Sequence, residues 1–201
     1  CIRMEYQSIR CQNTKKNMTC YHSLPQVSDT YLKALTDKCR NQHAWFRAHE
    51  DGLRPGDTAY REGKNYTNNV EADYVYYYDD WVFEYANKII PTALKNDVSG
   101  IALTKLEKGQ EISPHVDQGR EAMICLAVWP QYDDYQPTTY YYHNDLVFLD
   151  NYNIGVPALC NLKILHSAKN FTDHNRYNLQ ISFNEVPYEE LLSKITTKDV
   201  G

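Results

Sequence analysis

The sequence predicts a mainly β fold with flanking α-helices. After residue 98, short runs of β-branched, aromatic and alternating apolar residues follow one another, with turn residues and no helical pattern between them. Several strands in such a row are typical of a sandwich or a barrel. The strand-like runs lie at 100–109, 122–129, 138–144, 145–150, 159–166 and 176–183.

Helical spacing occurs in the first half of the chain and again near its end. Ser28 can cap a helix that runs to Cys39 with apolar residues every three or four positions. A second helix is predicted from Asp79 to Pro91, because proline ends or kinks a helix. Residues 187–195 predict a short closing helix.

A chain of 201 residues is long enough for one domain with a substantial core and too short for two. We therefore expect a single domain over 1–201. Its predicted parts are a helical and loop region (1–95), a β core (96–185) and a C-terminal helix (186–201).

Charge and hydropathy argue against two classes of partner. The net charge is -5 and the lysines and arginines are scattered, so no basic face for nucleic-acid phosphates is expected. No apolar run approaches the roughly 20 residues of a membrane-spanning helix. The sequence begins at Cys1 without a leader, so we expect it to be trimmed, processed or incomplete.

The number and spacing of the cysteines indicate in which cellular compartment the protein resides. Six cysteines in 201 residues are sparse for a disulfide scaffold, and no C-x-x-C occurs, which favours a reducing cytoplasm. Cys125 lies in the apolar run "MICLAVW" and is expected to be a small buried hydrophobe. Three glycosylation sequons leave secretion open; they begin at Asn17, Asn65 and Asn170.

The stretch "EISPHVD" places His115 and Asp117 two positions apart. Residues i and i+2 of a strand point to the same face, roughly 6–7 Å apart, so an imidazole and a carboxylate at this spacing can share one metal ion. Candidates for a third ligand are His143, His166 and His174. Of these, His166 closes the apolar run "LCNLKIL", where a strand is predicted to end.

Arg176 opens the predicted strand "RYNLQISF". At the start of a core strand, an arginine would carry a buried and uncompensated charge unless an anion binds it. A guanidinium matches a carboxylate with two parallel hydrogen bonds. Two histidines and one carboxylate with open positions are typical of non-haem Fe(II) oxygenases. A carboxylate-binding arginine near such a site predicts that the co-substrate is a carboxylic acid.

The segments "LTKLEKGQEISPHVD" and "LKILHSAKNFTDHNRYNLQISF" resemble the 2-oxoglutarate, Fe(II)-dependent oxygenases. The resemblance covers about 95–185 and is nearest to aspartyl/asparaginyl β-hydroxylase-like and prolyl-hydroxylase-like members. It implies a double-stranded β-helix (jelly-roll) core. It also implies iron ligands and residues that hold the distal carboxylate of 2-oxoglutarate. The ligands would be His115, Asp117 and His166, and the carboxylate would meet Arg176, Asn178 and Thr104.

The substrate does not carry over from the resemblance. Aspartyl/asparaginyl β-hydroxylases use an arginine and a histidine on the strand after the first ligand, and 122–129 contains neither. Arg120 and Tyr141 are the expected substrate contacts, although Arg120 could simply lie in a loop. The polar stretch 48–72 and the tyrosine-rich segment 132–143 are the expected lid.

The implied activity is hydroxylation of a C–H bond with O2 and 2-oxoglutarate, and ascorbate is a possible accessory reductant. An amino-acid side chain, free or in a peptide, is the favoured substrate. Three alternatives stay open: a cupin-like metal enzyme that does not use 2-oxoglutarate, a non-catalytic jelly-roll binding module, and a zinc hydrolase.

Overall fold

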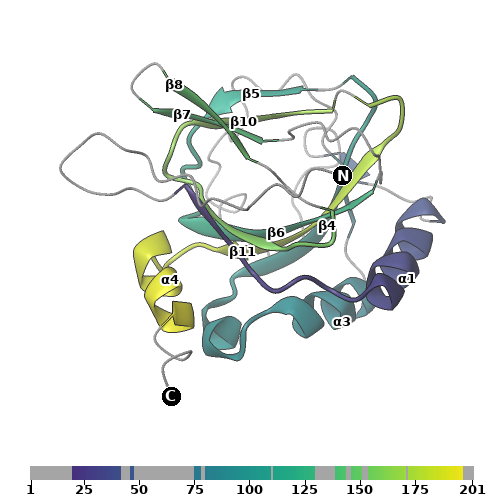
Figure 1. Cartoon of the computed structure of the whole chain (residues 1–201), viewed down its shortest axis with the longest axis horizontal. Helices are drawn as coiled ribbons and strands as arrows, with labels where there is room; N and C mark the ends of the chain where they lie inside the picture. Colours follow the sequence, from purple (N-terminus) through teal and green to yellow (C-terminus); the bar gives the residue numbers. More distant parts are fainter. Residues whose placement is uncertain are drawn as a thin grey trace, which may run out of the picture.

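Two antiparallel sheets face each other, and α-helices cover the outer face of the larger one (Figure 1). The computed structural model describes residues 20–41, 46–47, 75–77, 80–109, 111–129, 139–143, 146–150, 154–170 and 172–196. The larger sheet has the order β1 (Tyr21–Ser23), β9 (Ala158–Asn161), β6 (Ala122–Trp129), β11 (Arg176–Phe183), β4 (Gly100–Leu106), β3 (Val75–Tyr77) and β2 (Phe46–Arg47). The smaller sheet has the order β5 (Glu111–His115), β10 (His166–Lys169), β7 (Thr139–His143) and β8 (Leu146–Asp150).

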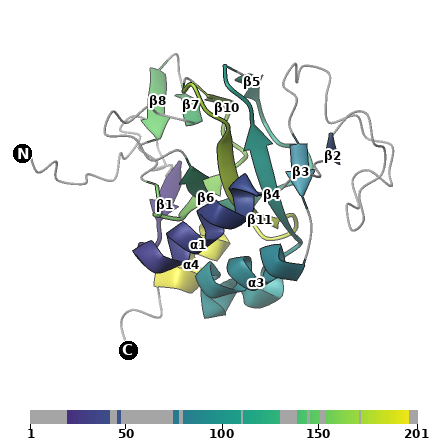
Figure 2. The ribbon, with the colours of Figure 1, turned by 90° about the vertical axis from the view of Figure 1, so that its right-hand side faces the viewer.

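Within the described residues the helices are α1 (Asp29–Arg40), α3 (Asp80–Ile89) and α4 (Tyr188–Thr196), with a 3₁₀ helix η1 (Thr92–Asp97) after α3. Figure 2 shows α1, α3 and α4 on the side of the larger sheet opposite the smaller sheet. The predicted cap of α1 is confirmed, since the Ser28 hydroxyl accepts a hydrogen bond from the Tyr31 amide at 3.2 Å. Pro91 lies between the end of α3 at Ile89 and the start of η1 at Thr92, as expected from its missing N–H.

The period-2 alternation of the central strands separates an apolar face from a polar one. On β11, Leu179, Ile181 and Phe183 are fully buried in the main core, which they share with the helices. Residues of the opposite parity, Arg176 and Asn178, face the smaller sheet. Strand β6 divides its residues between the main core and a second, sulfur-rich cluster in the same way. The helices therefore back the larger sheet, and its other face is available for chemistry.

Most strands predicted from the second half are confirmed, and one is wrong. The run 159–166 was predicted as one strand, but β9 ends at Asn161 and β10 begins at His166. The Asn161 side-chain oxygen accepts a hydrogen bond from the Lys163 amide at 3.0 Å, a local turn that competes with the strand ladder. His166 therefore opens a strand in the other sheet instead of closing one.

The first half also contributes strands. Strands β1 and β2 were not predicted, and β3 lies within the tyrosine-rich run 74–78. Short strands at sheet edges carry too few residues to show a period. Of the predicted lid, 48–72 and 132–138 lie outside the described residues, and 139–143 forms strand β7. The predicted helix end at 197–201 also lies outside them. In the described part of the chain, no helix is both long and apolar enough to cross a membrane.

Asn170 is a structural clamp, although it begins a glycosylation sequon. It is 1% exposed, and its Nδ2 lies 3.0 Å, 3.0 Å and 2.7 Å from the carbonyl oxygens of Leu106, Glu107 and His174. Its own carbonyl accepts a hydrogen bond from the Gly109 amide at 3.0 Å, in a turn where Gly109 has a φ of 73°. A glycan on this nitrogen is incompatible with the fold.

We predict that Asn170→Ala lowers the free energy of unfolding by about 2–4 kcal/mol, because it removes the side-chain amide that donates to the carbonyl oxygens of Leu106, Glu107 and His174. Urea unfolding followed by circular dichroism measures this. Asn184→Ala is the matched control, since the Asn184 Oδ1 has no hydrogen-bond partner among the described residues. Equal losses in the two variants would contradict the clamp.

Candidate metal centre

Two histidines from different strands are brought face to face. In the antiparallel pairing of β5 with β10, His166 lies directly opposite His115. Directly opposed residues have Cβ atoms about 4.5–5.5 Å apart, on the same face of the sheet. The two imidazole rings are accordingly 4.5 Å apart between centroids, at an angle of 51°.

Asp117 completes the group from a loop. It lies two residues beyond the end of β5, so it does not share a strand with His115 as the sequence predicted. The connection between β9 and β10 fixes its backbone instead. The Asp117 amide donates to the Leu162 carbonyl at 3.2 Å, and its carbonyl accepts from the Lys163 Nζ at 3.1 Å. Tertiary contacts, and not a shared strand, therefore bring Asp117 close to His115.

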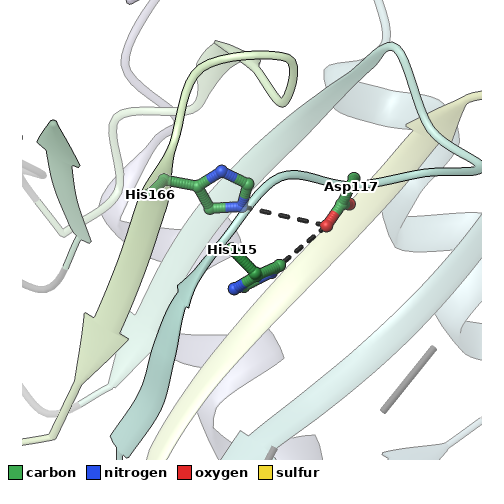
Figure 3. A group of neighbouring side chains, drawn as sticks. All are labelled: His115, Asp117 and His166. Atoms are coloured by element: carbon green, nitrogen blue, oxygen red, sulfur yellow. Dashed lines mark ion pairs between the residues drawn. The ribbon is translucent and has the colours of Figure 1, made fainter. Parts of the chain in front are cut away.

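The three side chains point toward one another between the sheets (Figure 3). The Asp117 Oδ1 lies 3.2 Å from the His115 Nε2 and 3.9 Å from the His166 Nε2. One donor atom from each residue lies within 4.8 Å of the other two. Adjacent donors bound at about 2.1 Å to one ion lie roughly 3 Å apart, so small side-chain rotations suffice for a metal to fit.

The hydrogen bonds fix the tautomer that a metal needs. The His166 Nδ1 lies 2.8 Å from the Ile164 carbonyl oxygen, which can only accept, so this nitrogen carries the proton. Nε2 then holds a lone pair and faces the Asp117 carboxylate. Histidines that bind metals are commonly oriented by such a bond on the other ring nitrogen.

The electrostatics favour the same protonation states. Burial alone would raise the pKa of Asp117, but the Arg120 guanidinium and the two histidines outweigh it and hold that pKa well below its usual range. Burial lowers the pKa of His166 to about 4, against the opposing attraction of the Asp117 carboxylate. At neutral pH the site therefore presents a carboxylate and a neutral imidazole, the forms that bind a cation.

The sequence as a whole matches no protein-family profile and no curated protein. Solved structures do resemble this one. A prolyl-4-hydroxylase from Pseudomonas putida superposes with a TM-score of 0.52 at 10% identity, over 83% of this chain and 93% of that one. A prolyl hydroxylase from Trichoplax adhaerens, in complex with a peptide fragment of hypoxia-inducible factor, gives 0.56 at 14% identity, over 88% of each chain. SnoN, a non-haem α-ketoglutarate-dependent epimerase, gives 0.53 at 11% identity, over 82% and 77%.

The chain has the fold of the 2-oxoglutarate, Fe(II)-dependent oxygenases. The predicted double-stranded β-helix with flanking helices is confirmed. Sequence identities of 10–14% to these structures establish the fold alone. The chemistry therefore has to be argued from the side chains of this chain.

In this oxygenase fold, the three residues predicted to hold 2-oxoglutarate lie on adjacent strands. Asn178 of β11 pairs directly with Thr104 of β4. Arg176 is 4% exposed, and its Nε donates to the Asn178 Oδ1 at 3.3 Å. The Thr104 hydroxyl lies 3.3 Å from the Asn178 carbonyl oxygen, to which it donates. Asn178 thus orients Arg176 and anchors Thr104, and direct contact of the three with a carboxylate stays a prediction.

The predicted substrate contacts have different positions. Arg120 lies against Asp117, with its Nε 2.6 Å from the Asp117 Oδ2. Tyr141 lies on β7 opposite His166, and its side chain is outside the described part of the structure. Sequence reasoning did not single out Lys163, which joins the Asp117 carbonyl to the Glu121 carboxylate. No local signal identifies it, because a lysine in a turn is usually solvated.

We predict that stability depends on pH through His166. The metal-free folded protein keeps His166 neutral down to a pKa of about 4, whereas the unfolded chain protonates it near pH 6.5. The unfolded state therefore binds an extra proton between these values. The free energy of unfolding falls by up to about 3 kcal/mol as the pH drops from 6.5 to 4.

Urea unfolding at a series of pH values measures this dependence. His166→Gln should flatten it between pH 4 and 6.5, whereas His174→Gln, in the exposed turn before β11, should not. Asp117 contributes only to the lower part of this window, because the unfolded chain begins to protonate it below about pH 5, toward its ordinary pKa of about 4. An unchanged slope in His166→Gln would contradict the assignment.

Proposed function

We propose that this protein is a non-haem Fe(II) dioxygenase that couples the oxidative decarboxylation of 2-oxoglutarate to oxidation of a substrate C–H bond. The observation that carries the proposal is the convergence of His115, Asp117 and His166. Two imidazoles and one carboxylate with further positions open are the ligand set of Fe(II) oxygenases. Their occurrence in a fold shared with prolyl hydroxylases supports iron over other metals.

The residues of this chain would divide the work. His115, Asp117 and His166 would hold Fe(II), which supplies the redox chemistry that consumes O2 and converts 2-oxoglutarate to succinate and CO2. Arg176, oriented by Asn178, would bind the distal carboxylate of 2-oxoglutarate. Burial of Asp117 and His166 limits the access of water to the site, which protects reactive species.

An amino-acid side chain, free or in a peptide, is the substrate class that we favour. The Trichoplax adhaerens protein binds a peptide fragment, and the Pseudomonas putida protein is a prolyl-4-hydroxylase. SnoN is an epimerase, so the fold alone does not fix the reaction outcome. We propose hydroxylation as the outcome and the chain's own active-site entrance as the determinant of which side chain is accepted.

The alternatives make different demands on Arg176. A cupin-like enzyme without 2-oxoglutarate, a zinc hydrolase or a binding module does not need a cation at this position. Here the guanidinium is almost fully buried at the start of a core strand and held by a neighbouring amide. A buried guanidinium on this face of the sheet suits a carboxylic-acid co-substrate, because it can bind a carboxylate through two parallel hydrogen bonds.

We predict that anaerobic addition of Fe(II) and 2-oxoglutarate to the wild type produces a weak visible metal-to-ligand charge-transfer band. His166→Ala should abolish the band because it removes a ligand. Arg176→Gln should keep it but require at least about tenfold more 2-oxoglutarate, since a charged hydrogen-bonded pair contributes about 1.5–3 kcal/mol. Arg40→Gln, on helix α1, is the matched control for loss of charge.

The outcomes separate the alternatives. Iron binding without the band would support an enzyme that does not use 2-oxoglutarate. Absence of iron binding would overturn the oxygenase proposal. A band with no succinate formed from 2-oxoglutarate under O2, across a panel of peptides and free amino acids, would leave a binding module as the better description.

A further inference from the structure

The loop between β5 and β6 brings a second functional side chain to Asp117. The Arg120 Nε donates to the Asp117 Oδ2 at 2.6 Å, and this atom is not the carboxylate oxygen nearest the histidines. At its other end, the Arg120 Nη1 lies 3.7 Å from the Met123 Sδ on β6. Two contacts in different directions thus fix the guanidinium beside the carboxylate.

The two oxygens of Asp117 consequently have different partners. Oδ1 faces the His115 Nε2 at 3.2 Å and the His166 Nε2 at 3.9 Å. Oδ2 faces Arg120 at 2.6 Å. The Asp117 side chain is only 4% exposed, so water competes little for either oxygen.

We infer that Arg120 is a positioning residue that restricts Asp117 to binding a metal through Oδ1 alone. This inference rests on the proposed function. It also assigns Arg120 a role different from the substrate contact expected from the sequence, because two of its nitrogens are already engaged inside the protein.

The restriction matters because positions around the ion are few. An octahedral ion has six. Two imidazoles and one carboxylate oxygen leave three, which a chelating 2-oxo acid and O2 together require. A carboxylate bound through both oxygens leaves only two. By holding Oδ2, Arg120 would keep the third position available.

Lys163, in the connection between β9 and β10, provides a comparison. Its Nζ contacts the Asp117 main-chain carbonyl at 3.1 Å and the Glu121 carboxylate at 3.0 Å. It has the same charge as Arg120 and supports the backbone of Asp117, but among the described residues its Nζ contacts the Asp117 carbonyl and the Glu121 carboxylate and not the Asp117 carboxylate. Substitution of Lys163 therefore separates loss of charge and loop support from loss of control over Oδ2.

The experiment compares Arg120→Gln, Arg120→Lys and Lys163→Gln with the wild type. Fe(II) affinity is measured anaerobically, and the visible absorption of bound Co(II), which reports coordination number, is recorded for each protein. Loss of a group that orients a metal ligand typically lowers metal affinity 10–100-fold. Arg120→Gln should show this loss and an altered Co(II) spectrum, Arg120→Lys a partial return of both, and Lys163→Gln an unaltered spectrum.

Circular dichroism and thermal unfolding establish that each variant is folded before comparison. An unaltered Co(II) spectrum and affinity in folded Arg120→Gln, or equal changes in Lys163→Gln, would overturn the inference and leave the oxygenase proposal intact. If the wild type binds metal but gives no band with 2-oxoglutarate, the proposed function fails while the Co(II) spectra still decide the role of Arg120. If the wild type binds neither Fe(II) nor Co(II), both the proposed function and the inferred role of Arg120 are overturned.

Discussion

The buried carboxylate of Asp117 is the interaction on which the rest of the site depends. An ionised carboxylate inside a protein is costly unless cations and hydrogen-bond donors surround it. Here the Arg120 guanidinium donates to it from the same loop, and the Nε2 atoms of His115 on β5 and His166 on β10 lie 3.2 Å and 3.9 Å from its Oδ1. The site can therefore form only when β5, β10 and the loop after β5 are in place.

The larger sheet supplies the rigid platform for this arrangement. Its helix-backed face carries fully buried residues such as Leu179, Ile181 and Phe183, and close packing of this kind resists deformation. The same strand, β11, carries Arg176 and Asn178 on its other face. A period of two residues would thus let one strand serve both stability and the proposed binding of 2-oxoglutarate, without a compromise at any single position.

The connection between β9 and β10 links the two sheets at the metal centre. Its residues accept the Asp117 amide, donate to the Asp117 carbonyl and orient the His166 ring through the Ile164 carbonyl. Main-chain groups make two of these three contacts. They are indifferent to side-chain identity, which fits a fold shared with solved structures at only 10–14% identity.

The sequence by itself determined the helices α1 and α3 and the strands β6 and β11, because each shows its period within a few neighbouring residues. It also pointed to His115, Asp117, His166 and Arg176 through residue type and spacing. Only the tertiary structure decided that 159–166 divides between two sheets and that Asp117 lies off the strand. It alone placed Arg120 on one carboxylate oxygen. These features depend on pairing between residues far apart in the chain, and such pairing leaves no local period to read.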